Sequence, residues 1–147
     1  MAVTFQWYGN ILSERMRRNA WEGVKSAASI LQTRARILCN RPAKRIRVKR
    51  IRNTSAGKKG STYTVFRPSA PGSPPALRTG FGRRNILIEF DQPALTARIG
   101  PSRNAIYMAY LEVGSQFYRP RPWLSVAVQQ TQRQIDLVIM AYLKRGL

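Results

Sequence analysis

Residues 45–66, which read RIRVKRIRNTSAGKKGSTYTVF, decide the fold of the middle of this chain. Apolar and basic residues alternate as far as Lys49, and residues 61–67 alternate again and are rich in Thr, Tyr, Val and Phe. Both patterns are typical of β-strands. Residues 53–60 are turn-like, because two glycines flank a pair of lysines. The stretch predicts a β-hairpin, here called the basic arm, over about 41–68, with one face that holds little but Arg and Lys.

Charge is concentrated in and around the basic arm. No acidic residue lies between Glu22 and Glu89, and residues 23–88 hold 16 of the 26 basic residues. Charges this dense repel one another unless an anion compensates them, and a lone hairpin is marginally stable in water. We therefore expect the arm to contact an acidic protein or another polyanion through Arg45, Arg47, Lys49, Arg50, Arg52, Lys58, Lys59, Tyr63 and Phe66.

Two long amphipathic helices are predicted, one near each end of the chain. Apolar residues recur at steps of three and four over about 10–40, and again from about 123 to 144. Pro42 ends the first helix. The predicted buried stripes are Met16, Ala20, Val24, Ala27, Ala28, Leu31, Ala35 and Leu38 in the first helix, and Leu124, Ala127, Val128, Thr131, Ile135, Val138, Ile139 and Tyr142 in the second.

The remaining segments complete an α+β fold. Residues 69–75 are rich in Pro and Gly and should be extended. Residues 85–91 and 95–100 are predicted to be two strands joined by a short turn, and residues 104–113 a short helix. The helical spacing of that segment runs through Ile106, Ala109, Tyr110 and Val113. We expect one domain over residues 1–147, with two long helices packed on a small, mostly antiparallel sheet and the basic arm inserted as a protruding hairpin.

Composition argues against catalysis. The 147 residues include 26 basic and six acidic ones, which gives a net charge of +20, and no His. Triads with an imidazole base and metal sites with His ligands are excluded, and six scattered carboxylates do not favour a hydrolase or a multi-acid metal site. Cys39 is the only cysteine, so no internal disulfide forms, and we expect an inert, buried thiol. We predict no enzyme activity, no cofactor and no metal.

Targeting signals are not expected. Residues 1–10 have neither a basic start nor an apolar stretch like that of a secretory signal, and no apolar run approaches the length that spans a bilayer. We therefore expect a protein of a reducing, cytosol-like compartment that does not enter a membrane.

Three short blocks lie in a fixed order over residues 71–127. The first is PGSPP at 71–75 followed by TGFGRRNI at 79–86, the second is YMAYLEVGS at 107–115, and the third is RPWL at 121–124. Together they resemble the signature of bacteriophage neck and tail-completion proteins, which are small head–tail joining components of long-tailed phages and prophage-derived particles. The chain departs from the family pattern with Gly82 for Leu, Asn85 for Ser and Trp123 for Phe.

The resemblance implies a structural connector without catalysis. It implies a ring of six or twelve copies between the portal or adaptor and the tail-tube or tail-terminator proteins, with DNA passing through. The location would be the neck of a virion assembled in the host cytoplasm. We expect the isolated protein to be monomeric or weakly associated. Twelve copies would carry a formal charge of +240, so we favour arms that clasp a neighbouring subunit or adaptor, with proximity to packaged DNA as the second possibility.

Further interface residues are expected in the second and third blocks. Glu112 should pair with Arg119, Arg121 or an arginine of a neighbouring subunit, and Trp123 should be an anchor that packs on the first helix. Four aromatic residues fit an interface and core packing equally well: Tyr107, Tyr110, Phe117 and Tyr118.

The alternative function is that of a basic nucleic-acid-binding protein. An arginine-rich hairpin with Tyr63 and Phe66 nearby suits a β-arm that contacts phosphates or a groove. Against it, the chain has no known nucleic-acid motif and few aromatic side chains for stacking on the arginine-rich face.

Overall fold

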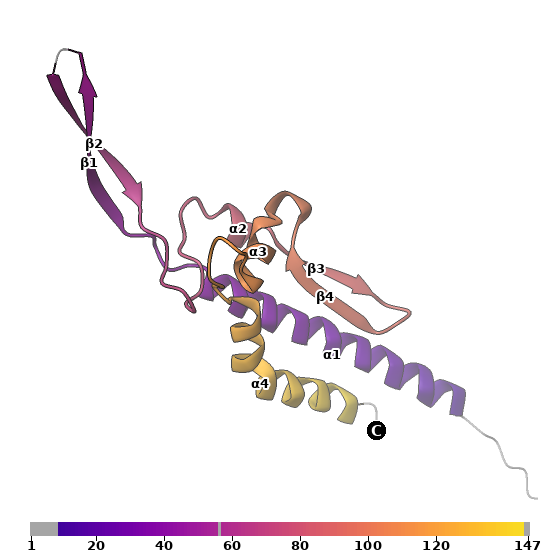
Figure 1. The fold of residues 1–147 in the computed structure, drawn as a ribbon. Coiled ribbons are helices and arrows are strands. Elements are labelled where there is room, and N and C mark those ends of the chain that lie inside the picture. Colours follow the sequence, from indigo (N-terminus) through magenta and orange to yellow (C-terminus); the bar gives the residue numbers. More distant parts are fainter. Residues whose placement is uncertain (1–8, 56, 146–147) are drawn as a thin grey trace, which may run out of the picture. The chain divides into compact units, whose positions relative to one another are not determined.

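The computed structural model describes residues 9–55 and 57–145. The α+β prediction is confirmed: the chain has two long helices and two small antiparallel sheets of two strands each (Figure 1). Most of the stretch examined for a signal sequence, residues 1–8, lies outside the described residues. The elements are α1 Gly9–Leu38, β1 Arg45–Thr54, β2 Gly57–Phe66, α2 Phe81–Arg84, β3 Ile86–Asp91, β4 Thr96–Pro101, the 3₁₀ helix η1 Arg103–Ala105, α3 Tyr107–Val113 and α4 Leu124–Lys144.

The chain divides into two compact units. The first contains α1 up to Ala35, residues 86–100 with the β3–β4 hairpin, and α4. The second contains residues 36–85, with the β1–β2 hairpin and α2, and residues 101–123, with α3. Within the described ranges, neither long helix has the length and hydrophobicity that crossing a bilayer requires.

In the first unit, the β3–β4 hairpin runs alongside α1 (Figure 1). Ile86 begins β3 and is fully buried, and its carbonyl accepts a hydrogen bond from Gln32 Nε2 at 2.8 Å. Further along the hairpin, the rings of Phe90 and Trp21 meet edge to face with centroids 5.6 Å apart. The alternation of side chains along β3 thus places Ile86 and Phe90 on the face that packs against α1.

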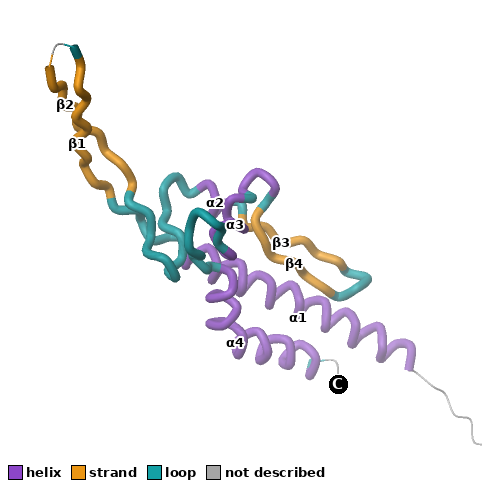
Figure 2. The backbone as a smooth tube through the Cα atoms, in the orientation of Figure 1, coloured by secondary structure: helices purple, strands orange, loops and turns teal. Residues whose placement is uncertain are grey.

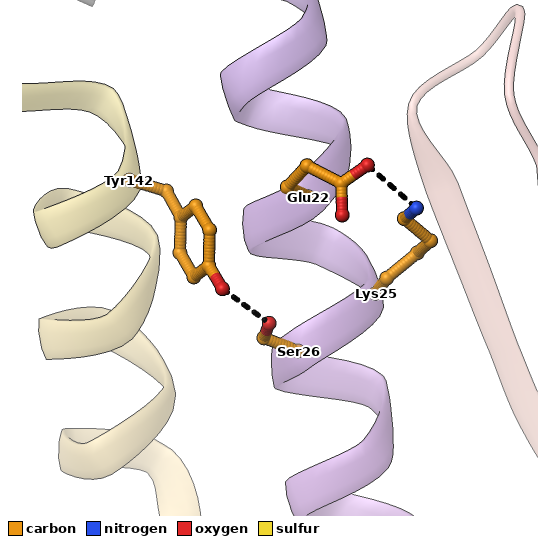
Figure 3. A network of polar contacts seen from close by, with 4 residues as sticks. All are labelled: Glu22, Lys25, Ser26 and Tyr142. Carbon is orange, nitrogen blue, oxygen red and sulfur yellow. Dashed lines mark hydrogen bonds and ion pairs between the residues drawn. The ribbon is translucent and has the colours of Figure 1, made fainter. Parts of the chain in front are cut away.

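The helices α1 and α4 are antiparallel neighbours. Arg34 Nε donates to Gln130 Oε1 at 2.8 Å, and Ser26 Oγ donates to Tyr142 Oη at 3.1 Å (Figure 3). Buried alanines, including Ala127 of α4, let the helices approach closely. On the outer side of this contact, Glu22 forms an ion pair with Lys25 one turn later along α1, at 2.6 Å (Figure 3).

The predicted helix stripes are correct in their centres and wrong at two positions. Met16 is 37% exposed, because α4 reaches Tyr142 beside Ser26 and ends at Lys144, so Met16 lies beyond its end. Val128 is 36% exposed, whereas its neighbour Ala127 is buried. The smaller side chain of Ala127 therefore faces α1, and Val128 lies outside that contact. Gly23 is also buried, although it belongs to neither predicted stripe.

Gly23 is the point of closest approach between α1 and α4. A Cβ atom built there would lie 3.3 Å from Tyr142 Cβ and 3.6 Å from Ile139 Cα. The first distance is tighter than an ordinary contact, and the second is an ordinary van der Waals contact with backbone, so a side chain that extends beyond Cβ has little room. A larger residue at position 23 must therefore push the two helices apart.

The first prediction concerns this contact. Gly23→Leu should lower the free energy of unfolding by about 1 to 3 kcal/mol, because the added side chain overpacks the helix interface. Ser29→Leu adds a similar side chain to an exposed position of the same helix and should change it by less than about 0.5 kcal/mol. Urea denaturation followed by circular dichroism measures both, and equal effects of the two variants would contradict the assignment.

In the second unit, β1 and β2 pair only with each other, as a long hairpin (Figure 2). The register runs from Arg45 opposite Phe66 to Thr54 opposite Gly57. The basic arm is thus confirmed as a hairpin, but its turn is shorter than the predicted 53–60. The strands extend to Thr54 and resume at Gly57, whose φ of 108° favours glycine. Lys58 and Lys59 therefore lie in β2 and not in the turn.

Candidate functional site

The three sequence blocks meet at one place in the second unit. We call this place the motif junction and define it as residues 69–77, 108–112 and 120–123. The backbone N–H of Gly72 donates to the Pro120 carbonyl at 2.9 Å, and that of Arg121 donates to the Leu111 carbonyl at 2.7 Å. These bonds join three segments: the proline-rich segment, α3, and the connector that precedes α4. Segments far apart in the sequence therefore form one local structure.

Trp123 closes the motif junction onto α3. Its side chain is 1% exposed, and the indole Nε1 donates to the carbonyl of Met108 at 2.9 Å. Its backbone N–H donates to Glu112 Oε2 at 2.7 Å. Both hydrogen bonds go to α3, whereas the sequence predicted that Trp123 packs on the first helix.

Glu112 has a backbone partner that the sequence pattern did not indicate. The Glu112 carboxylate accepts from the backbone N–H of Trp123. Arg121 lies in the same junction, but its Nε donates to the carbonyl of Ser69 at 3.0 Å and not to a carboxylate. Both residues are thus used to fix backbone segments. Arg119, the other predicted partner, lies on an exposed connector.

Gly82 makes room for α3 beside the motif junction. A Cβ atom at position 82 would lie 2.6 Å from both Met108 Sδ and Tyr107 Oη. These two side chains occupy the space that the leucine of the family pattern would need. The substitution of Gly for Leu is therefore compatible with close packing at this point.

Cys39 lines a cavity of about 440 Å³ next to Gly82. The thiol is 3% exposed. Burial, and then the negative charge of Glu112, raise its pKa from 9.0 to about 12. The thiol is thus protonated at neutral pH, which is the state of an unreactive cysteine. The other lining residues are Pro75, Ala76, Leu77, Arg78, Thr79, Gly80, Phe81, Gly82, Arg83, Tyr107, Met108 and Leu111.

The basic arm is bonded to the motif junction at its root. The N–H of Arg67 donates to the Lys44 carbonyl at 2.8 Å and closes the base of the hairpin. The N–H of Ala43 donates to the Leu77 carbonyl at 3.0 Å, and the N–H of Leu77 donates to the Arg41 carbonyl at 2.7 Å. The arm is therefore attached through backbone groups, which do not depend on its side chains.

The two faces of the arm differ, which corrects the prediction of a single basic face. Residues directly opposite in an antiparallel pair share a face, and successive residues alternate between faces. One face, here called the clasp face, has an apolar root and a basic outer half. The other, here called the cation row, begins with Arg45 opposite Phe66. The clasp face contains Ile46, Val48, Tyr63 and Val65, then Arg50, Arg52 and Lys59; the cation row contains Arg45, Arg47 and Lys49, opposite Phe66, Thr64 and Thr62.

Two adjacent basic residues, Lys49 and Arg50, cause this split. They interrupt the alternation of apolar and basic residues, so the basic positions change face in the middle of β1. This doublet is the signal in the sequence from which the two faces follow. Of the apolar residues of the clasp face, Tyr63 was among the predicted contact residues, whereas Ile46, Val48 and Val65 were not.

Like charges are held close together on the arm. Arg52 lies directly opposite Lys59, an arrangement that destabilises a hairpin unless an anion compensates it. At the root, the Phe66 ring has the guanidinium carbons of Arg45 and Arg78 at 5.5 and 5.2 Å from its centroid. The predicted contact residues Tyr63 and Phe66 therefore lie on opposite faces of the hairpin.

The helical spacing of apolar residues noted over 104–113 falls on an exposed side of α3. Val113 is 75% exposed, whereas Met108, on the opposite side of the helix, is buried. The segment YMAYLEV carries apolar residues on both sides, so its periodicity does not select one. Six large exposed side chains, here called the α3 apolar surface, lie on α3 or within five residues of it: Ile106, Tyr107, Tyr110, Val113, Phe117 and Tyr118.

Charge is distributed unequally between the two units. The second unit contains 17 basic residues and one acidic residue, Glu112, whereas the first contains nine basic and five acidic residues. Glu112 is engaged in the motif junction. Within the described part of the chain, no carboxylate forms an ion pair with the cation row. Within the second unit, a single carboxylate thus faces 17 basic side chains.

Comparisons with family models, curated proteins and solved structures found no match for this chain. In residues 9–55 and 57–145, no three Cys, Asp or Glu side chains are grouped so that they would hold a metal ion.

The second prediction concerns Glu112. Glu112→Ala should lower the free energy of unfolding by about 1 to 3 kcal/mol, because the N–H of Trp123 loses its acceptor. Glu112→Gln keeps an acceptor oxygen and should cost less than about 1 kcal/mol. Urea denaturation measures both variants. An equal loss in both would mean that the charge of Glu112, and not its hydrogen bond, stabilises the junction.

Proposed function

We propose that this chain is a structural head–tail connector of a tailed phage or phage-like particle. Copies of it would form a ring of six or twelve between the portal or adaptor and the tail-tube or tail-terminator proteins, with DNA passing through. The role is mechanical and includes no catalysis. Its place is the neck of the virion, which is assembled in the host cytoplasm.

The observation that carries the proposal is the motif junction. The second and third blocks of the three that resemble the neck and tail-completion family are hydrogen-bonded to each other through Arg121 and Trp123. The first block is bonded through Gly72 to Pro120, the residue directly before the third block. Their function is therefore to build one local structure, which accounts for their presence as a set. The junction holds no reactive group, and what it positions is the basic arm and the α3 apolar surface.

The α3 apolar surface suits the contact between copies. Each copy carries +20, so two copies repel wherever their charged surfaces meet. None of the six residues of the α3 apolar surface is charged at neutral pH. Exposed aromatic and aliphatic side chains of this kind are enriched in protein interfaces. We assign this surface to the contact between neighbouring copies in the ring.

The clasp face of the arm suits a contact with a different, acidic protein. Its root is apolar and its outer half is basic, which is the composition of an interface with an apolar centre and a charged rim. The like-charged pair of Arg52 and Lys59 would be compensated by carboxylates of that partner. An adaptor or tail protein with an acidic surface fulfils this requirement, whereas another copy of this basic chain does not.

The third prediction tests the contact between copies. Ile106→Ser combined with Val113→Ser should reduce ring formation on the adaptor at least tenfold, because it removes two apolar side chains from the contact. Leu137→Ser combined with Met140→Ser makes comparable changes on an exposed part of α4 and should leave ring formation unchanged. Native mass spectrometry with the adaptor counts the bound copies. Full rings with the first pair of substitutions would refute this assignment.

The fourth prediction tests the arm. Deletion of residues 45–66, with a short glycine linker from Lys44 to Arg67, should leave a folded protein, because these two residues are already hydrogen-bonded. The deletion should block the joining of heads to tails. Complementation of particles that lack the gene, followed by electron microscopy, measures joining. Circular dichroism checks the fold, and normal joining by a folded deletion variant would exclude the clasp.

A further inference from the structure

The cation row has no role in the contacts assigned so far. Arg45, Arg47 and Lys49 are all exposed and lie on the face of the arm opposite the clasp face. We propose that the cation row binds the phosphate backbone of double-stranded DNA without reading its sequence. The inference rests on the proposed function, in which DNA passes through the ring, and it names the surface that meets the DNA.

The geometry of the row fits a chain of phosphates. Alternate residues of a strand lie about 7 Å apart, so the three cations form a straight, evenly spaced series along β1. Thr62 and Thr64 lie directly opposite Lys49 and Arg47 on the same face. The hydroxyl groups of these threonines can donate hydrogen bonds to phosphate oxygens. Threonine side chains are short, so they do not cover the cationic side chains opposite them. The row therefore combines charge and hydrogen-bond donors along its whole length.

The composition of the row favours DNA over a protein partner. Between Arg45 and Lys49 the apolar residue on this face is Phe66, whose ring has Arg45 and Arg78 beside it, whereas the clasp face has four apolar residues over the same length of the hairpin. A protein interface gains most of its stability from apolar burial in its centre. Binding to DNA depends on phosphate neutralisation and counterion release, which need only accessible cations.

The positive charge of the cation row is reinforced by a neighbouring cation. Arg78 lies against the same Phe66 ring as Arg45, so a further cation is held at the root of the row. No carboxylate pairs with the three cations within the residues that the structure describes. The row thus has a high local concentration of positive charge, which attracts a polyanion at long range.

The test uses two variants that remove three charges each from opposite faces of the same arm. The first is R45Q/R47Q/K49Q, which neutralises the cation row. The second is R50Q/R52Q/K59Q, which neutralises the outer half of the clasp face. Binding of the full-length proteins to a fluorescent duplex of about 20 base pairs is followed by anisotropy over a range of salt concentrations. Circular dichroism and thermal unfolding confirm that both variants are folded.

The two variants should differ in the salt dependence of binding. Loss of three phosphate contacts lowers the slope of log affinity against log salt by about 2 to 3, and this is expected for R45Q/R47Q/K49Q. The slope for R50Q/R52Q/K59Q should stay within about 0.5 of that of the unsubstituted protein. Equal decreases would mean that DNA responds only to net charge, and a larger decrease for the second variant would place DNA on the clasp face. Either result overturns the proposal.

The same variants separate this inference from the proposed function. The DNA titration uses purified protein and no particle components, so its outcome does not depend on head–tail joining. R50Q/R52Q/K59Q should impair joining in the complementation assay while its DNA binding is retained. If the chain is a connector but its cation row does not bind DNA, R50Q/R52Q/K59Q will still impair joining and the two variants will have equal salt slopes. If the chain is not a connector, no variant will impair joining.

Discussion

Uncompensated positive charge is the constraint on which the rest of this structure depends. The second unit carries 17 basic residues and a single carboxylate, and that carboxylate accepts a hydrogen bond from the backbone of Trp123. One carboxylate cannot neutralise 17 basic side chains, so most of the charge of the unit has no carboxylate partner inside it. Backbone hydrogen bonds, the buried indole of Trp123 and the close packing beside Gly82 hold it together instead.

The two sides of α3 have different roles. Its inner side carries Met108 and Glu112, whose carbonyl and carboxylate hold Trp123 in place. Its outer side carries Tyr110 and Val113 without any cover from the chain itself. A seven-residue helix thus serves both as an internal support and as an external surface. The arm also has two different faces, and backbone hydrogen bonds attach its root to the rest of the unit.

Periodicity and composition predicted most of the elements, because long amphipathic helices and alternating strands produce strong patterns. The basic hairpin, α1 and α4 were all expected. The outward side of α3 was not, since the segment is apolar on both sides and only the hydrogen bonds of Trp123 select the inner one. Gly23 was missed because a glycine within an apolar stripe indicates close approach only when the facing helix is known. The hydrogen-bond partners in the motif junction were also beyond prediction, because backbone contacts leave no mark on side-chain identity.

The strict pairing of β1 with β2 limits how the arm can evolve. Adding one residue to each strand would preserve the pairing but rotate every position beyond the insertion onto the opposite face. The outer arginines would then exchange sides with their neighbours. Insertions or deletions that keep both faces intact must therefore change each strand by two residues at a time, so arm length in such a chain varies in discrete steps of about 7 Å.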